Sequence, residues 1–201
     1  MKKSRRFIDS FIGDYFGESR DNFAENLAGL MAKSKQFLEL CEKDLSFAKS
    51  IYTNDGSQES RRVYIRALPA YVEGSLNFLR IMPHLYPPLL DRIPNDCLVL
   101  FAEPIIELRN RSSVKETIKK TLIGFGKISN ANIKSDIMGT RGAQSLLRTF
   151  ELRGNLMHPR SIEGFNVSDE QMLEAEQGLL WYRQQFKVVI SPLSKVVKDL
   201  S

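Results

Sequence analysis

One arginine and one histidine stand close together near the carboxyl end of a strongly patterned segment. They are Arg153 and His158 in the stretch ELRGNLMHPR (151–160), and the chain contains only two histidines. Imidazole gains and loses a proton near neutral pH, and guanidinium is a permanent planar donor that suits phosphate oxygens. These two residue types at this spacing therefore suit the cleavage of a phosphodiester bond.

The arginine lies on a predicted helix that covers about 140–157. Five of its residues recur at steps of four and three and are predicted to face the core: Ala143, Leu147, Phe150, Gly154 and Met157. On that stripe Gly154 would let a neighbouring helix approach closely. Arg153 falls at the edge of the stripe, where its long side chain can reach solvent or a cleft.

Pro159 is expected to end this helix, because its ring disfavours the α conformation for the residue before it. Positions five apart on an ideal helix lie about 140° apart around the axis. Arg153 and His158 would therefore converge only if the backbone changes course at 158 or if a second chain contributes to the site.

Helical spacing also dominates the rest of the chain. We predict long helices over about 21–50 and 59–81, with Pro69 as a kink or as the true start of the second. Capping signatures at Ser113 with Glu116 and at Ser168 with Gln171 predict two further helices.

The remaining segments are less regular. The stretch 95–108 reads as a strand or a buried helix, and its helical neighbours favour helix. Prolines at 83, 87 and 88 predict a turn region, and 124–139 resembles a mixed loop. The expected fold is all-α, an up-and-down helical bundle of about five to seven helices.

Size and charge limit the class of protein. The chain has 201 residues, and we predict a single domain over 1–201 with a core at about 20–190, a basic N-terminal arm and a short C-terminal helix appended. No apolar run approaches the roughly 20 residues that span a bilayer, so we expect no membrane partner. Asp9, Asp14 and Glu18 interrupt any secretion signal, which favours a cytoplasmic location. A net charge of +5 mildly favours an anionic partner such as RNA.

Cys41 and Cys97 show no metal-ligand spacing, and we predict two core thiols. We expect no metal and no cofactor. The sequence also has no phosphate-binding glycine loop or nucleophile elbow that would support a small-molecule enzyme.

At Arg153 and His158 the chain resembles the HEPN superfamily, small all-helical proteins in which an arginine is followed four to six residues later by a histidine, before a final long helix. The early segment 67–78, which contains Glu73, looks like the glutamate-containing early helix of many members. The resemblance covers roughly 60–190.

The resemblance implies a metal-independent endoribonuclease of the defence or toxin type in the active members. There the histidine takes part in proton transfer while a 2′-hydroxyl attacks the adjacent phosphate, and the arginine stabilises the charge on the phosphoryl oxygens. Active members pair their motifs across two protomers, which implies a homodimer, and an antitoxin or other protein is a possible partner.

The chain departs from the family pattern directly after the arginine. Active members commonly carry a polar residue there, whereas this chain has Gly154, with Asn155 as a possible supporting residue one place later. The glycine favours the second alternative, a non-catalytic helical module that binds RNA, a nucleotide or a protein. Arg148, Arg160 and Lys119 are the candidate RNA-binding residues.

Several of these residues also have ordinary structural interpretations. His158 could be a helix-end residue, and Arg153 could form a salt bridge with Glu151, Glu163 or an acidic residue of another helix. His84, between two prolines, is expected in a loop. The basic runs, Arg61 and Arg62 among them, are solvated faces or phosphate contacts, and Trp181 and Tyr182 are core or dimer interface.

Overall fold

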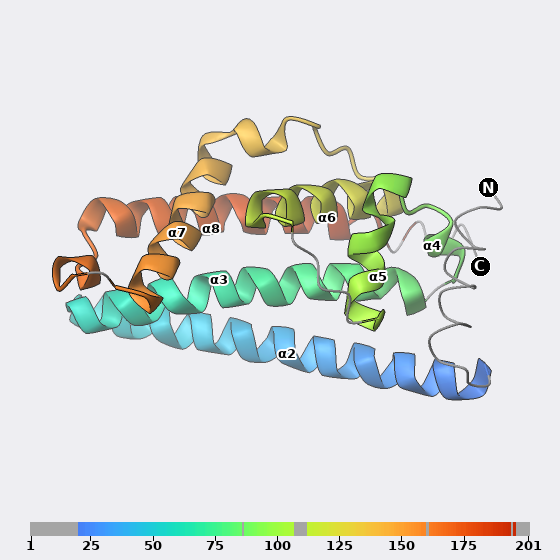
Figure 1. The fold of residues 1–201 in the computed structure, drawn as a ribbon, viewed down its shortest axis with the longest axis horizontal. Coiled ribbons are helices and arrows are strands. Elements are labelled where there is room, and N and C mark those ends of the chain that lie inside the picture. Colours follow the sequence, from blue (N-terminus) through green and yellow to red (C-terminus); the bar gives the residue numbers. More distant parts are fainter. Residues whose placement is uncertain (1–19, 86, 107–111, 160, 194, 196–201) are drawn as a thin grey trace. The chain divides into compact units, whose positions relative to one another are not determined.

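The computed structural model describes residues 20–85, 87–106, 112–159, 161–193 and 195. Within them the chain is helical with no strand, which confirms the predicted all-α class (Figure 1). The helices are α2 (Arg20–Asp55), α3 (Gln58–Ile81), α4 (Pro87–Leu90), α5 (Leu98–Ile106), α6 (Val114–Ser129), α7 (Arg141–Met157) and α8 (Asp169–Ile190). Short 3-10 turns are η1 (Met82–Leu85), η2 (Asn95–Cys97), η3 (Ile137–Gly139) and η4 (Glu163–Phe165). The basic N-terminal arm lies outside the described residues.

The chain forms two compact units, each of which has its own core. Unit 1 comprises the described parts of 1–36, 76–135 and 187–201, and unit 2 comprises 37–75 and 136–186. Helices α2, α3 and α8 each contribute residues to both units. The candidate residues on α7 and the final long helix up to Phe186 belong to unit 2.

Unit 2 has a core of buried side chains from four helices. Its fully buried large residues include Leu45, Tyr64, Ile65, Leu68, Leu146 and Tyr182. Trp181 and Tyr182 are core residues, with 8% and 0% exposure. The Tyr182 hydroxyl lies 2.6 Å from the Ser75 hydroxyl, so this polar group is satisfied inside the core.

Helices α7 and α8 approach closely at two glycines. An added Cβ at Gly178 would lie 2.6 Å from the backbone nitrogen of Leu146, and one at Gly142 would lie 2.4 Å from Cβ of Trp181. No side chain fits at either distance, so glycine permits this helix contact.

The buried face of α7 differs from the predicted stripe. Among the five residues expected to face the core only Ala143 is buried, whereas Gly154 and Met157 are exposed. The buried residues of the helix are Ala143, Ser145, Leu146, Thr149, Leu152 and Leu156. A Cβ at Gly154 would meet nothing within 4 Å, so the predicted close approach at this residue is wrong.

Unit 1 is built around α6. The predicted capping box is present at its start, where the Ser113 hydroxyl accepts a hydrogen bond from the Glu116 backbone N–H. Phe125 is fully buried, and a Cβ at Gly124 would lie 2.7 Å from the ring of Phe101 on α5. The helix continues to Ser129, so the loop predicted for 124–139 is too long at its amino end.

The ambiguous segment around 97–101 is helical, as the sequence favoured. His84 is not the loop residue that its flanking prolines predicted. It lies in η1, is 5% exposed, and its Nε2 lies 2.9 Å from the Phe101 carbonyl oxygen. Pro83 and Pro87 lie in the first turns of η1 and α4, where a proline is tolerated.

Both cysteines are free and buried, which confirms the two predicted core thiols. Burial raises the pKa of the Cys97 thiol to about 11, so the thiol stays protonated at neutral pH. Pro69 lies inside α3, which runs unbroken from Gln58 to Ile81. No described helix is both long enough and apolar enough to cross a bilayer.

Candidate functional site

Arg153 projects from α7 toward α3 and is held there by a carboxylate. Its Nη1 donates to Oε1 of Glu73 at 3.1 Å, and the side chains of Arg153 and Glu73 are 33% and 50% exposed. The sequence left open a salt bridge to an acidic residue of another helix, and Glu73 is that residue. A guanidinium has five N–H donors, so this contact leaves donors for a further anion.

His158 is the residue at which α7 ends. Its φ of −134° and ψ of 63° are not helical, and its N–H donates to the Gly154 carbonyl at 3.1 Å. The helix therefore ends where Pro159 predicted. The side chain is exposed, so the imidazole is open to solvent.

The helix geometry of α7 does not direct Arg153 and His158 to one point. The backbone is helical up to Met157 and leaves the helical conformation at His158, and positions five apart on a helix lie about 140° apart around the axis. A cavity of about 190 Å³ lies between α7 and α8, and its lining includes neither of them.

That cavity contains two other candidate residues. Arg148 and Asn155 line it from α7, and Gln171 and Glu174 line it from α8. Arg148 is exposed and pairs with Glu174 at 2.7 Å. Asn155 is exposed and lies about 200° from Arg153 around the helix. Asn155 therefore faces the Arg148 side of α7.

The remaining candidates are placed separately. Lys119 is partly exposed on α6 and belongs to unit 1. Arg160 lies outside the described residues. Within the described part of the chain, no group of three or more His, Cys, Asp and Glu side chains forms a potential metal site.

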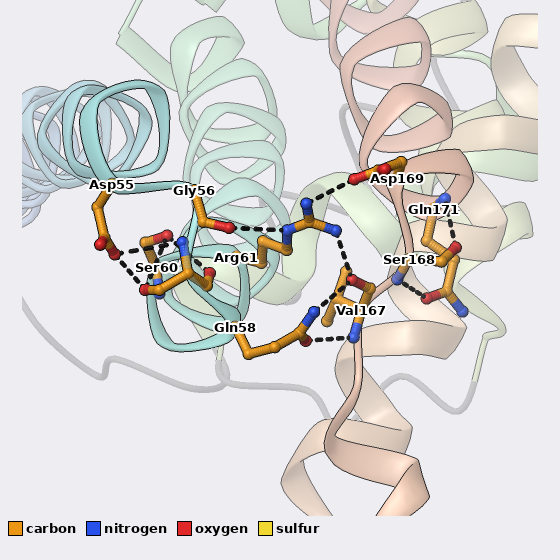
Figure 2. A network of polar contacts seen from close by, with 10 residues as sticks. Asp55, Gly56, Gln58, Ser60, Arg61, Val167, Ser168, Asp169 and Gln171 are labelled. Carbon is orange, nitrogen blue, oxygen red and sulfur yellow. Dashed lines mark hydrogen bonds and ion pairs between the residues drawn. The ribbon is translucent and has the colours of Figure 1, made fainter.

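Sequence reasoning missed the arginines of α3 that hold the segment after the motif. Arg61 donates to the Val167 carbonyl at 2.8 Å and pairs with Asp169 at 2.5 Å (Figure 2). Arg62 donates to the Phe165 carbonyl at 3.2 Å, with its guanidinium 6.0 Å from the Phe165 ring centroid. The segment between α7 and α8 is thereby fastened to the start of α3.

A glutamine completes this attachment. Gln58 donates from Nε2 to the Val167 carbonyl at 3.1 Å and accepts from the Val167 N–H at 2.7 Å, as Figure 2 shows. One step further along, Ser168 and Gln171 form the predicted reciprocal capping box. We call Gln58, Arg61, Arg62, Phe165 and Val167 with these bonds the α3 clamp.

The α3 clamp corrects the interpretation of Arg61 and Arg62 as a solvated face or a phosphate contact. Their side chains are only 18% and 19% exposed, and their donors are used by backbone carbonyls and by the carboxylates of Asp169 and Glu59. Arg66, one turn further on, donates to the Leu156 carbonyl at 3.4 Å, which satisfies one of the free carbonyls at the end of α7. In the sequence, two consecutive arginines with such a structural role look the same as two that face solvent.

Comparisons of the chain with protein-family models, with curated proteins and with solved structures find no match.

Proposed function

We propose that this chain is a metal-independent endoribonuclease of the HEPN type, in which Arg153 and His158 act on one RNA phosphate. The observation that carries the proposal is the arrangement at the end of α7. Arg153 is held by Glu73 yet keeps one third of its side chain exposed, and His158 is exposed at the terminus of the same helix. Both groups can therefore reach a polyanionic strand.

The proposed reaction needs two proton transfers and no metal. The 2′-hydroxyl loses its proton and attacks the adjacent phosphorus, the P–O5′ bond breaks, and the 5′ oxygen takes up a proton. The products are a 2′,3′-cyclic phosphate and a 5′-hydroxyl. His158 would carry one of the two protons, and Arg153 would stabilise the charge on the non-bridging oxygens.

A second copy of the chain would bring the two side chains together. Helix geometry does not direct the two side chains of one chain to the same point, so we propose a homodimer in which Arg153 of one copy and His158 of the other face one phosphate. Such a site also explains how a protein antitoxin could act, since a partner that covers the end of α7 or separates the copies would block it. We expect the reaction to take place on cytoplasmic RNA.

The test is cleavage of single-stranded RNA in EDTA. We expect the wild type to leave 2′,3′-cyclic phosphate ends and His158→Ala to lower the rate by about 10²- to 10⁴-fold, the range of general acid–base catalysis. Met157→Ala is the matched control, since Met157 is the exposed neighbour of His158 and should leave the rate unchanged. Full activity of folded His158→Ala would refute the proposal.

The alternative is a non-catalytic module that binds RNA, a nucleotide or a protein partner. The features that favour it are the Arg153–Glu73 ion pair, the angle of about 140° that separates positions five apart on a helix, and Gly154 after the arginine. This alternative predicts no cleavage. Its RNA affinity would fall steeply with salt, because phosphate contacts release counterions, whereas salt-insensitive binding would indicate a protein partner.

A further inference from the structure

The proposed cleavage moves two protons, and His158 carries only one of them. The 2′-hydroxyl loses a proton as it attacks, and the 5′ oxygen gains one as it leaves. An imidazole that gives its proton to the 5′ oxygen does not act at the same moment as a base for the 2′-hydroxyl. The reaction therefore calls for a second proton-transfer group within hydrogen-bond reach of the 2′-hydroxyl.

Glu73 of α3 lies next to the proposed phosphate ligand Arg153. Its Oε1 accepts a hydrogen bond from Nη1 of Arg153 at 3.1 Å, and both residues belong to unit 2. The side chain of Glu73 is 50% exposed, so solvent or a ligand can reach its carboxylate. A carboxylate has about four lone-pair sites, and the bond to Arg153 uses one of them. The oxygens of Glu73 can thus accept the hydrogen of a bound hydroxyl.

The contact with Arg153 determines where the carboxylate lies relative to a bound phosphate. In the proposed function the other N–H donors of Arg153 hold the non-bridging oxygens. An attacking 2′ oxygen lies about 3–3.5 Å from the phosphorus in a reactive geometry. A phosphate on Arg153 therefore brings its 2′-hydroxyl close to Glu73, which lies one hydrogen bond away from the same guanidinium.

The charges of the three groups also favour a base at this position. A carboxylate and a phosphate repel each other, and the guanidinium of Arg153 between them offsets part of this repulsion. When the carboxylate takes a proton from the 2′-hydroxyl it becomes neutral, so the repulsion is relieved while negative charge builds on the phosphoryl oxygens. An effect that is more favourable in the transition state than in the ground state raises the rate.

We propose that Glu73 is the general base of the reaction and that His158 is the general acid, an inference that rests on the proposed ribonuclease function. Glu73 takes the proton of the 2′-hydroxyl, the O2′–P bond forms, the P–O5′ bond breaks, and the imidazolium of His158 gives its proton to the 5′ oxygen. Glu73 then loses its proton to solvent and His158 regains one from solvent. In the proposed homodimer, Glu73 and Arg153 come from one copy and His158 comes from the other.

Glu73→Gln tests the base. Glutamine has nearly the same shape and keeps an oxygen that accepts the hydrogen bond of Arg153, but it does not take a proton from a hydroxyl. If Glu73 only held Arg153, glutamine would replace it with little loss. We expect folded Glu73→Gln to cleave single-stranded RNA in EDTA about 10²- to 10⁴-fold more slowly than the wild type. The ion pair is partly exposed, so its replacement should leave the fold intact.

Two further variants support this comparison. Glu73→Asp keeps a carboxylate on a shorter side chain and should cleave at least about tenfold faster than Glu73→Gln. Glu151→Gln is the matched control, since it makes the same change at an exposed glutamate of α7, and it should leave the rate unchanged.

A substrate with sulfur in place of the bridging 5′ oxygen separates the base from the acid. A thiol ionises at a pH of about 8.5, far below an alcohol, so a thiolate leaves without taking up a proton. The sulfur is placed at a linkage that the wild type cuts in the ordinary strand. There the loss of rate in His158→Ala should shrink by about tenfold or more, whereas the loss in Glu73→Gln should persist.

The results distinguish this inference from the proposed function. If the wild type cuts RNA and His158→Ala does not, the proposed function stands, and a Glu73→Gln variant that cuts at the wild-type rate overturns the role of Glu73. Rescue of Glu73→Gln by the sulfur linkage also overturns it, because that result would make Glu73 the acid. A wild type that leaves RNA intact in EDTA overturns both.

Discussion

The two histidines of the chain lie in opposite environments. His158 is exposed at the end of α7, whereas His84 is 5% exposed in η1. The Nε2 of His84 donates to the Phe101 carbonyl at 2.9 Å, so Nε2 carries a proton, and the buried Nδ1 has no hydrogen-bond partner. Burial is the main factor that lowers the pKa of His84 below its ordinary value of 6.5.

The lowered pKa of His84 predicts a loss of stability in acid. The unfolded chain takes up the proton near pH 6.5, whereas the folded chain takes it up only at lower pH. The contribution of His84 is therefore complete above pH 6.5 and falls as the pH drops toward its folded pKa. The free energy of unfolding, measured in urea at pH 7.5 and at pH 5, should differ less between the two pH values in His84→Gln than in the wild type. Glutamine keeps a donor for the Phe101 carbonyl. Equal differences would contradict this role.

The helices and their ends were the part of the structure that the sequence predicted best. The caps at Ser113 and Ser168 and the stop before Pro159 rest on local chemistry that can be read from a few neighbouring residues. The buried face of α7 could not be read in this way. The predicted stripe through Gly154 and the observed stripe through Leu146 have similar spacing. Leu146 faces the core because it packs closely against Gly178 of another helix, which the sequence of α7 does not show.

The two glycines provide a matched test of helix packing. Gly154→Ala should raise the free energy of unfolding by about 1 kcal/mol, because its Cβ meets nothing within 4 Å and alanine favours helix. Gly178→Ala should lower it by about 1–3 kcal/mol despite the same gain in propensity, because its Cβ would lie 2.6 Å from the Leu146 backbone. Chemical denaturation measures both. A loss of stability in Gly154→Ala would restore the packing role that the sequence assigned to this residue.

The sequence suggested Arg153 and His158 as candidate site residues, but it did not suggest the α3 clamp. Gln58 and Val167 are separated by 109 positions, and nothing in their local sequence connects them. Gln58→Ala should leave the buried Val167 N–H without its acceptor and lower the free energy of unfolding by about 1–3 kcal/mol.

Hydrogen exchange detects this effect directly. The Val167 amide should exchange about tenfold faster or more in Gln58→Ala, since about 1.4 kcal/mol corresponds to a factor of ten. Arg66→Ala is the control on the same helix, because Arg66 is exposed and its contact with the Leu156 carbonyl is longer, at 3.4 Å. It should leave the exchange at Val167 unchanged. An unchanged rate in Gln58→Ala would contradict the clamp.

At the scale of the whole molecule, the proposed function depends on how many copies of the chain form one site. A single chain holds Arg153 against Glu73 and leaves His158 at the end of α7, with neither in the cavity between α7 and α8. Because helix geometry does not bring both side chains to one phosphate, we propose that the second side chain comes from another copy. The proposed site therefore requires a dimer in solution, which light scattering coupled to gel filtration would detect.

Complementation between two inactive variants tests whether one site is built from two copies of the chain. Arg153→Ala and His158→Ala should each fail to cleave RNA alone. When the two are mixed and allowed to exchange subunits, each mixed dimer should regain one intact site, formed by His158 of the first variant and Arg153 of the second. We predict that cleavage in EDTA returns to about one quarter of the wild-type rate, since half of the dimers are mixed and each carries one of two sites. Subunit exchange without any return of cleavage would contradict a site shared between two copies.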